Sequence, residues 1–143
     1  MDTEKTLRQP GFVFLELYVE DPAYYVRIFR DALRFEVVRD EGTFVELRSE
    51  RGLVILNAFE DADPGHPFEH YRREKRRGVG VEIGIVTDRL AETWEVARGI
   101  DGCVVTDIVR QDWGMTDYRI LTPHGYYLRV TTPPASSEAE PGL

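Results

Sequence analysis

The chain has 143 residues, of which 42% are hydrophobic and 31% charged, and its formal net charge is −8. This length predicts one domain with its own hydrophobic core, and the acidic balance argues against nucleic acid or an anionic membrane as a partner. Cys103 is the single cysteine, which excludes an internal disulfide and a thiolate metal cluster.

The first predicted element is a β-strand over 12–20, and the polar segment 1–11 before it is expected to be loose and flexible. Side chains alternate within this strand, so aliphatic residues share one face while Phe14, Glu16 and Tyr18 share the other. The pattern predicts a strand whose aliphatic face packs against helices and whose aromatic and polar face points elsewhere.

A helix is predicted directly after this strand. Asp21 and Pro22 supply a side-chain cap and a proline at the first helical position, and hydrophobic residues then recur at helical spacing as far as Leu33. Three further strands, separated by turns that contain glycine, complete a β-α-β-β-β unit over 12–59; they are expected at 35–39, 43–49 and 53–59.

A polar insertion over 60–78 follows this first unit and contains a run of charged residues. We interpret it as a solvated linker or a short helix. His66 and His70 lie in it four residues apart, but a histidine pair inside a charged linker favours solvated side chains over a catalytic role.

The same order of elements returns over 79–131. A strand is predicted over 79–87, followed by a helix that Asp88 caps and that carries Leu90, Trp94 and Ala97 on its apolar stripe. Another strand is expected over 102–108, and a hairpin closes the unit with strands over 118–121 and 126–130.

The hairpin has a turn whose residue types explain the reversal of the chain. Pro123 presets φ, and Gly125 can supply a positive φ. The final segment 132–143 is rich in Pro, Ser and Glu, which predicts disorder. No charged and apolar leader opens the sequence and no apolar run reaches about 18 residues, so we expect a cytoplasmic protein.

Two β-α-β-β-β units of similar length in one chain indicate an internal duplication. The predicted fold class is α+β, with two modules that form curled, mixed sheets around a concave cleft and with the helices outside. Concave apolar surfaces are where small ligands bind.

These features resemble the glyoxalase/bleomycin-resistance, or vicinal oxygen chelate, superfamily. The resemblance is carried by the β-α-β-β-β duplication, by the helix start at 19–22 (Val-Glu-Asp-Pro), and by Trp113-Gly114-Met115 ahead of the C-terminal hairpin. Thr122 and His124 stand where the family usually has two aspartates. Together these features cover 12–131.

The resemblance also implies where a metal site would lie, because metal-dependent members place one His, Gln or Glu ligand in each of four strands. The corresponding residues here are Phe14, Ile55, Val81 or Glu82, and Arg129. At best one of these can ligate a metal, and a guanidinium stands where a carboxylate belongs. We therefore expect neither a metal nor another cofactor.

The face directed away from the helices is then expected to bind the ligand. It carries Phe14, Glu16, Tyr18, Glu82, Tyr127 and Arg129, and five more residues are placed near it, namely Phe44, Phe59, Trp113, Met115 and Tyr118. Stacked aromatic rings favour planar aromatic ligands, while the two glutamates can pair with the arginine or take a cationic or hydrogen-bonding ligand group. The alternative is a core of aromatic rings with a buried structural network of charges.

The chain most resembles the metal-free, antibiotic-binding branch of the superfamily. The resemblance implies a homodimer that sequesters a bulky aromatic natural product without altering it and so gives drug self-resistance. An alternative is a lyase, isomerase or dioxygenase of the same fold, with Glu82 or Glu16 as the base. A third is a structural or regulatory dimer with a vestigial cleft.

Overall fold

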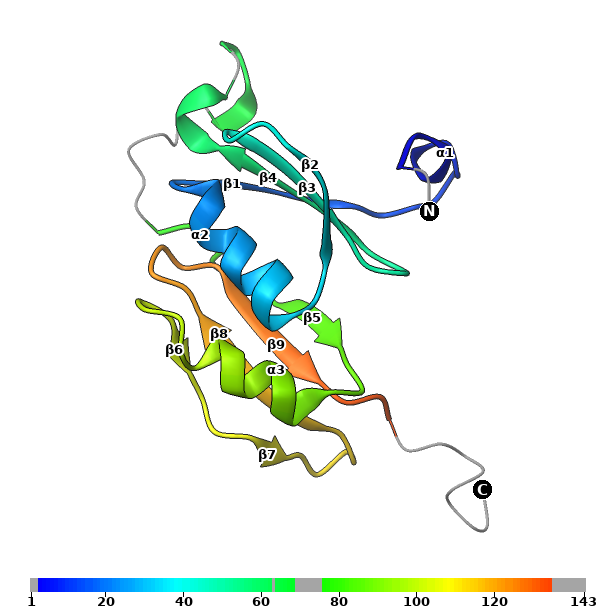
Figure 1. Cartoon of the computed structure of the whole chain (residues 1–143), viewed down its shortest axis with the longest axis vertical. Helices are drawn as coiled ribbons and strands as arrows, with labels where there is room; N and C mark the ends of the chain where they lie inside the picture. The colour runs from blue at the N-terminus through cyan, green and yellow to red at the C-terminus, as the bar shows by residue number, and fades with distance from the viewer. Residues whose placement is uncertain (1–2, 63, 69–75, 135–143) are drawn as a thin grey trace. The chain divides into compact units, whose positions relative to one another are not determined.

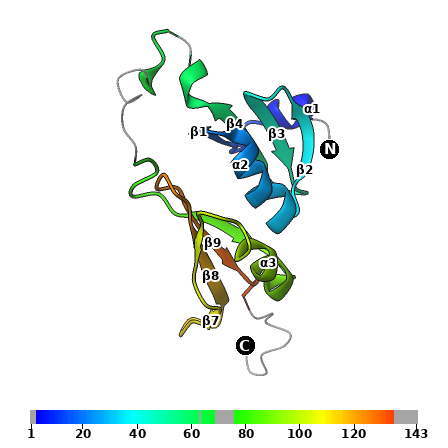
Figure 2. The same cartoon turned by 60° about the vertical axis from the view of Figure 1, so that its left-hand side comes forward.

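The computed structural model describes residues 3–62, 64–68 and 76–134. The chain divides into two compact units, Met1–Arg73 and Glu74–Leu143. Figures 1 and 2 show one sheet in each unit, with α2 along one face of the first sheet and α3 along one face of the second. No helix in the described part of the chain is long and apolar enough to cross a membrane.

The first sheet, sheet A, contains the four strands of the first unit in the order β1-β4-β3-β2. Strands β1 and β4 pair in parallel, and the other neighbours pair antiparallel. The strand bounds are β1 (Leu15–Val19), β2 (Glu36–Asp40), β3 (Phe44–Arg48) and β4 (Leu53–Ala58).

The predicted helix start of this unit is confirmed. The side chain of Asp21 accepts a hydrogen bond from Ala23 N at 3.1 Å, and α2 (Pro22–Val26) continues into a π-helical segment, η1 (Arg27–Ala32). Ile28 and Phe29 on this segment are fully buried. The core of the unit therefore lies between η1, α2 and the aliphatic face of sheet A, whose buried members include Leu17, Val19, Val45, Leu47 and Leu56.

Two segments depart from the expectations for the first unit. The segment 1–11, expected to be loose, contains a short helix, α1 (Thr3–Leu7), and its Thr6 is buried and accepts a hydrogen bond from Arg48 Nη2 at 3.0 Å. The segment expected to be a solvated linker begins with the 3-10 helix η2 (Phe59–Asp61) and then packs aromatic rings against Tyr18. His70 and most of the charged run lie outside the described residues.

The second sheet, sheet B, has the path β5-β9-β8-β6, with β7 also paired to β8. Strands β5 and β9 are parallel, and β8 and β9 form the predicted hairpin, with Gly125 at a φ of +103° in its turn. The bounds are β5 (Ile83–Val86), β6 (Val104–Val105), β7 (Val109–Arg110), β8 (Thr116–Leu121) and β9 (Tyr127–Thr131), with α3 at Leu90–Ala97.

Several boundaries in the second unit were predicted wrongly, including the start of β8, which lies at Thr116 and not at 118. The strand expected over 79–87 starts only at Ile83, because Gly78 and Gly80 before it have positive φ angles of 72° and 86°. The helix cap predicted at Asp88 falls on Arg89, which makes no side-chain capping bond. Only Val104–Val105 of the strand expected over 102–108 is β-structure, and the chain returns to strand at β7.

The internal duplication is confirmed by the strand order. In each sheet the first strand of the module pairs in parallel with the last, and the third strand lies beside the last on its other side. The structure is thus a mixed α+β fold with two mixed sheets.

Candidate ligand-binding site

Each sheet has one face turned away from its helix, which we call the helix-distal face. In sheet B the opposite face is defined by Tyr118, which is fully buried and donates a hydrogen bond from its hydroxyl to Thr93 of α3 at 2.8 Å. Side chains alternate along a strand, so the helix-distal face of sheet B follows from the strand register; it carries Gly84, Val86, Asp117, Arg119, Leu121, Tyr127, Arg129 and Thr131, with Glu82 just ahead of β5.

A charged network occupies the centre of this face. Arg129 Nε lies 3.2 Å from Glu82 Oε2, and Arg129 Nη1 lies 3.8 Å from Asp117 Oδ2. Asp117 is 2% exposed and accepts a hydrogen bond from Gln111 Nε2 at 2.9 Å. Arg129 thus bridges two carboxylates, one from β8 and one from the residue just ahead of β5.

Tyr127 belongs to the same network. Its hydroxyl donates a hydrogen bond to Glu82 Oε1 at 2.6 Å. Burial, followed by this hydrogen bond to a carboxylate, raises the pKa of Tyr127 above its ordinary value of 10.0. The phenol therefore stays protonated at neutral pH and orients the Glu82 carboxylate.

Three buried polar atoms on this face lack a hydrogen-bond partner among the described residues. They are Asp117 Oδ2, Arg119 Nε and Arg129 Nε; the ion-pair distance from Arg129 Nε to Glu82 is short but its geometry does not make a hydrogen bond. Unpaired buried polar groups cost free energy. These three atoms are buried, so a ligand on this face meets first the partly exposed side chains of Arg119 and Arg129.

Arg119 lies directly opposite Arg129 on the neighbouring strand. Like charges in this position repel each other, and the Arg119 guanidinium makes no hydrogen bond or ion pair with the described residues. An acceptor-rich ligand group placed between the two guanidiniums would relieve this repulsion.

On sheet A, three of the predicted site residues remain accessible to a ligand on the helix-distal face. Phe14 is exposed, while Glu16 and Phe44 are half-buried, and Glu16 Oε2 accepts a weak hydrogen bond from Asn57 Nδ2 at 3.4 Å. Arg39 of β2 lies over the Phe44 ring at 5.1 Å. Their contact with a ligand stays a prediction.

Tyr18 and Phe59 do not fit the predicted ligand surface. Tyr18 is 9% exposed, and its ring is covered by Phe59, His66 and Phe68, with ring centroids 4.8 to 6.2 Å away. Phe59 stacks on Phe68 and is also buried. These rings form a small core beneath the segment 59–68, so their assignment to an open binding face was wrong.

Tyr118 was also placed wrongly, because it lies in the core on the helix side of sheet B. Trp113 and Met115 lie in the connection between β7 and β8, where Gln111 N donates to Met115 O at 2.8 Å. The Trp113 side chain is 58% exposed, as a ring available to a ligand would be.

Two residues of the network were missed from the sequence, namely Asp117 and Arg119. The signal for them was present, because polar residues at 117 and 119 alternate with Tyr118 and Ile120. That alternation places Asp117 and Arg119 on one face and both apolar residues on the other.

The residues at the family's metal positions do not fit a metal ion. Glu82 lies 3.2 Å from Arg129 on the helix-distal face, and it is the one potential ligand among the four positions. Phe14 and Ile55 carry no donor atom, and the Arg129 guanidinium would repel a divalent cation. In the described part of the chain, no three His, Cys, Asp or Glu side chains come together in a metal-binding arrangement.

The two mixed sheets define a class of α+β proteins built from duplicated β-α-β-β-β modules. The profile of the Glyoxalase/Bleomycin resistance protein/Dioxygenase superfamily matches residues 11–130. The chain therefore belongs to this superfamily. No curated protein sequence gives a close match.

Solved structures of the same fold include proteins with different descriptions. A glyoxalase/bleomycin resistance protein/dioxygenase family enzyme from Burkholderia phytofirmans PsJN has a TM-score of 0.64 at 13% identity, covering 83% of this chain and 95% of that one. Lactoylglutathione lyase from Agrobacterium tumefaciens has a TM-score of 0.57 at 20% sequence identity, and the match covers 87% of this chain and 96% of that one. TioX from Micromonospora sp. ML1 has a TM-score of 0.59 at 14% sequence identity, and the match covers 87% of this chain and 97% of that one. At these identities the likeness concerns the fold alone.

Proposed function

We propose that this protein binds a planar aromatic small molecule on the helix-distal face of sheet B and releases it unchanged. The observation that carries the proposal is the pair of partly exposed guanidiniums of Arg119 and Arg129, which lie opposite each other on neighbouring strands. A planar ligand with acceptor atoms on its ring, as a hydroxyquinone has, accepts hydrogen bonds from both guanidiniums and relieves their repulsion. The exposed Trp113 ring supplies a surface for stacking.

Binding without turnover is supported by the chemistry of the side chains on this face. Both oxygens of Glu82 already face a partner, Tyr127 through a hydrogen bond and Arg129 through an ion pair. Asp117 is held by Gln111 and Arg129. A general base needs a free acceptor within reach of the proton that it removes. Both Glu82 oxygens are engaged, and the one Asp117 oxygen without a hydrogen bond, Oδ2, is buried 3.8 Å from Arg129 Nη1. The proposal includes antibiotic sequestration by a homodimer.

Native mass spectrometry of the purified protein with a panel of aromatic antibiotics tests this function. The expected result is a dimer that takes up about one unaltered drug per chain. A drug whose mass changes during incubation would replace the binding function with an enzymatic one. Uptake of no drug across the panel would contradict sequestration.

Three variants locate the ligand. Trp113→Ala should weaken binding by roughly 1–4 kcal/mol, the range for a ring that anchors an interface.

Arg119→Met should weaken binding by about tenfold, because a donor to the ligand is lost. The same variant should not reduce folding stability, because the repulsion between Arg119 and Arg129 is removed. Tyr118→Phe is the control: it changes a buried residue on the other face of the sheet, so affinity should stay the same. Weaker binding in the Tyr118 variant alone would place the ligand elsewhere.

A further inference from the structure

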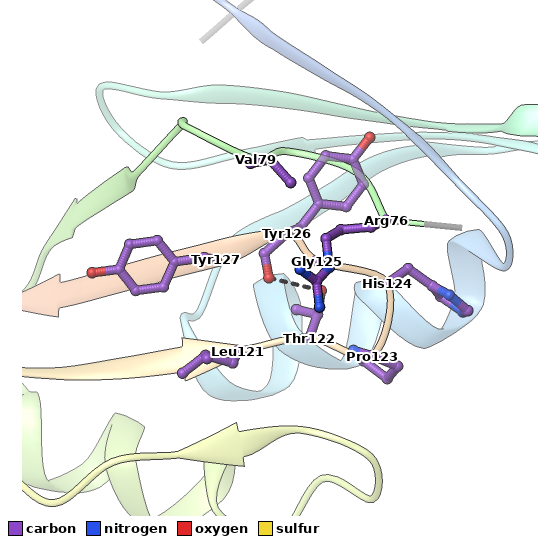
Figure 3. A pocket seen from close by; sticks show the side chains of 9 residues that line it. All are labelled: Arg76, Val79, Leu121, Thr122, Pro123, His124, Gly125, Tyr126 and Tyr127. Atoms are coloured by element: carbon purple, nitrogen blue, oxygen red, sulfur yellow. Dashed lines mark hydrogen bonds between the residues drawn. The ribbon is translucent and has the colours of Figure 1, made fainter. Parts of the chain in front are cut away.

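The turn of the β8–β9 hairpin borders a pocket that lies entirely in the second unit (Figure 3). Its volume is about 580 Å³, within the range of small-ligand sites. It is lined by the end of the connection before β5 and by the hairpin turn, which contribute Arg76, Val79, Leu121, Thr122, Pro123, His124, Gly125, Tyr126 and Tyr127.

Two glycines create this pocket by letting the connection approach the turn. A Cβ on Gly125 would lie 2.5 Å from Arg77 O, and a Cβ on Gly78 would lie 2.7 Å from the Tyr126 ring. Arg77 N donates a hydrogen bond to His124 O at 2.6 Å. The backbone of Arg77 therefore contacts the turn directly. Arg76, the residue before Arg77, is held beside the turn by this contact.

The charge of the lining differs from that of the whole chain. The chain has 26 acidic residues against 18 lysines and arginines, yet the lining contains Arg76 and His124 and no carboxylate. Figure 3 shows the Arg76 side chain extending across the turn toward Gly125 and Thr122, and its Cγ lies 3.0 Å from the position of a Gly125 Cβ.

The Arg76 guanidinium makes no hydrogen bond or ion pair with the part of the chain that the structure describes. His124 also lines the pocket, but its ring points away from the Arg76 side chain (Figure 3). The remaining walls are apolar or aromatic, above all Val79, Tyr126 and Tyr127. An unpaired guanidinium beside apolar walls is suited to an acid attached to an aromatic ring.

We propose that this pocket binds an aromatic carboxylic acid, with the carboxylate on Arg76 and the ring against the apolar part of the lining. The residues that hold this acid differ from the Asp117, Arg119 and Arg129 set, so the inference does not depend on the function proposed above. The two sites adjoin, because Tyr127 and Arg129 are two residues apart on β9, a distance of about 7 Å along a strand.

Isothermal titration of the full chain with 2-naphthoate, and with its uncharged counterpart 2-naphthamide, tests this assignment. The wild-type chain should bind the acid about tenfold more tightly than the amide, since one charge-assisted hydrogen bond is lost with the amide. Arg76→Gln should remove this preference and leave the affinity for the amide unchanged. Arg110→Gln removes an exposed arginine of the same unit that does not line the pocket, so the preference should persist.

Equal affinity of the wild-type chain for acid and amide would overturn the proposal, as would an unchanged preference in Arg76→Gln. Inorganic phosphate and 2-naphthyl phosphate distinguish the kind of acid: displacement of naphthoate by millimolar phosphate alone would overturn the carboxylate assignment in favour of a phosphate site. The Arg119→Met variant separates the two sites. It should keep the naphthoate preference, and loss of the preference in that variant would assign the acid to the network on the sheet instead.

Discussion

At the scale of single residues, Tyr127 shows how the network sets the properties of its members. Its pKa is higher in the folded chain than the ordinary value of 10.0, first through burial and then through the Glu82 hydrogen bond. A raised pKa means that the protonated phenol contributes stability below about pH 10, and that this contribution is lost as pH rises through the folded pKa.

Glu82→Gln should lower the pKa of Tyr127 toward 10.0, because the variant loses both the carboxylate acceptor and its negative charge. Phenolate absorbance during an alkaline titration measures the change, and Tyr127→Phe assigns the signal. The pKa of Tyr118 is raised mainly by its burial, so it serves as an internal control that should not move. A Tyr127 titration unaffected by Glu82→Gln would mean that the two side chains do not pair in solution.

Residue positions were predictable from sequence where the signal was local. The Asp21 cap and the positive φ of Gly125 follow from residue type and immediate neighbours, and both are observed. The face of Tyr118 was available from the alternation over 117–120, but the predicted strand began at 118 and left out Thr116 and Asp117, which belong to β8. The burial of Tyr18 required knowledge of where His66 and Phe68 pack, and a charged insertion gives no local sign of this contact.

At the scale of elements, the β8–β9 hairpin and the connection before β5 are held together by direct backbone contact. Their contact depends on Gly125, whose φ of +103° is unfavourable for other residues and whose missing Cβ leaves room for Arg77 O. The segment 76–80 therefore owes its path to the turn, which explains why the predicted strand over 79–87 begins late.

Gly125→Ala should destabilise the chain by about 1–3 kcal/mol, because it combines backbone strain with a clash against a carbonyl oxygen. Urea unfolding measures the loss. Gly80→Ala is the matched control: Gly80 has a φ of +86°, but a Cβ there would meet nothing within 4 Å. The difference between the variants reports the clash alone. Equal losses would show that the connection does not touch the turn.

At the scale of the whole molecule, the two modules have the same strand order but different chemistry at equivalent positions. Glu16 pairs with Ile55 on sheet A, and the corresponding pair on sheet B is Gly84 with Arg129. The strand order was predictable because each module repeats one hydrophobic pattern. Which ligand the faces bind was not, because that depends on single side chains and not on the pattern that makes the fold.

Divalent metal ions should not raise the melting temperature of the whole protein. A metal that binds the native state at about 100 times its Kd adds about 2.7 kcal/mol of stability, which thermal unfolding detects readily. Scans with zinc, nickel or manganese should match scans with a chelator, because Phe14 and Ile55 cannot ligate and Arg129 repels a cation. A melting temperature that rises with metal, and no longer does so in Glu82→Gln, would establish a metal site after all.

The cationic lining of the turn pocket also bears on how fast an acid arrives there. The chain carries a net charge of −8, so an anionic ligand approaches against a repulsive field whose reach falls from about 30 Å at 0.01 M salt to about 8 Å at 0.15 M. Added salt should therefore raise the association rate of the acid. It should also weaken the attraction between Arg76 and the bound acid. Such a site fills and empties faster as ionic strength rises, so its occupant exchanges more readily at 0.15 M salt than at 0.01 M.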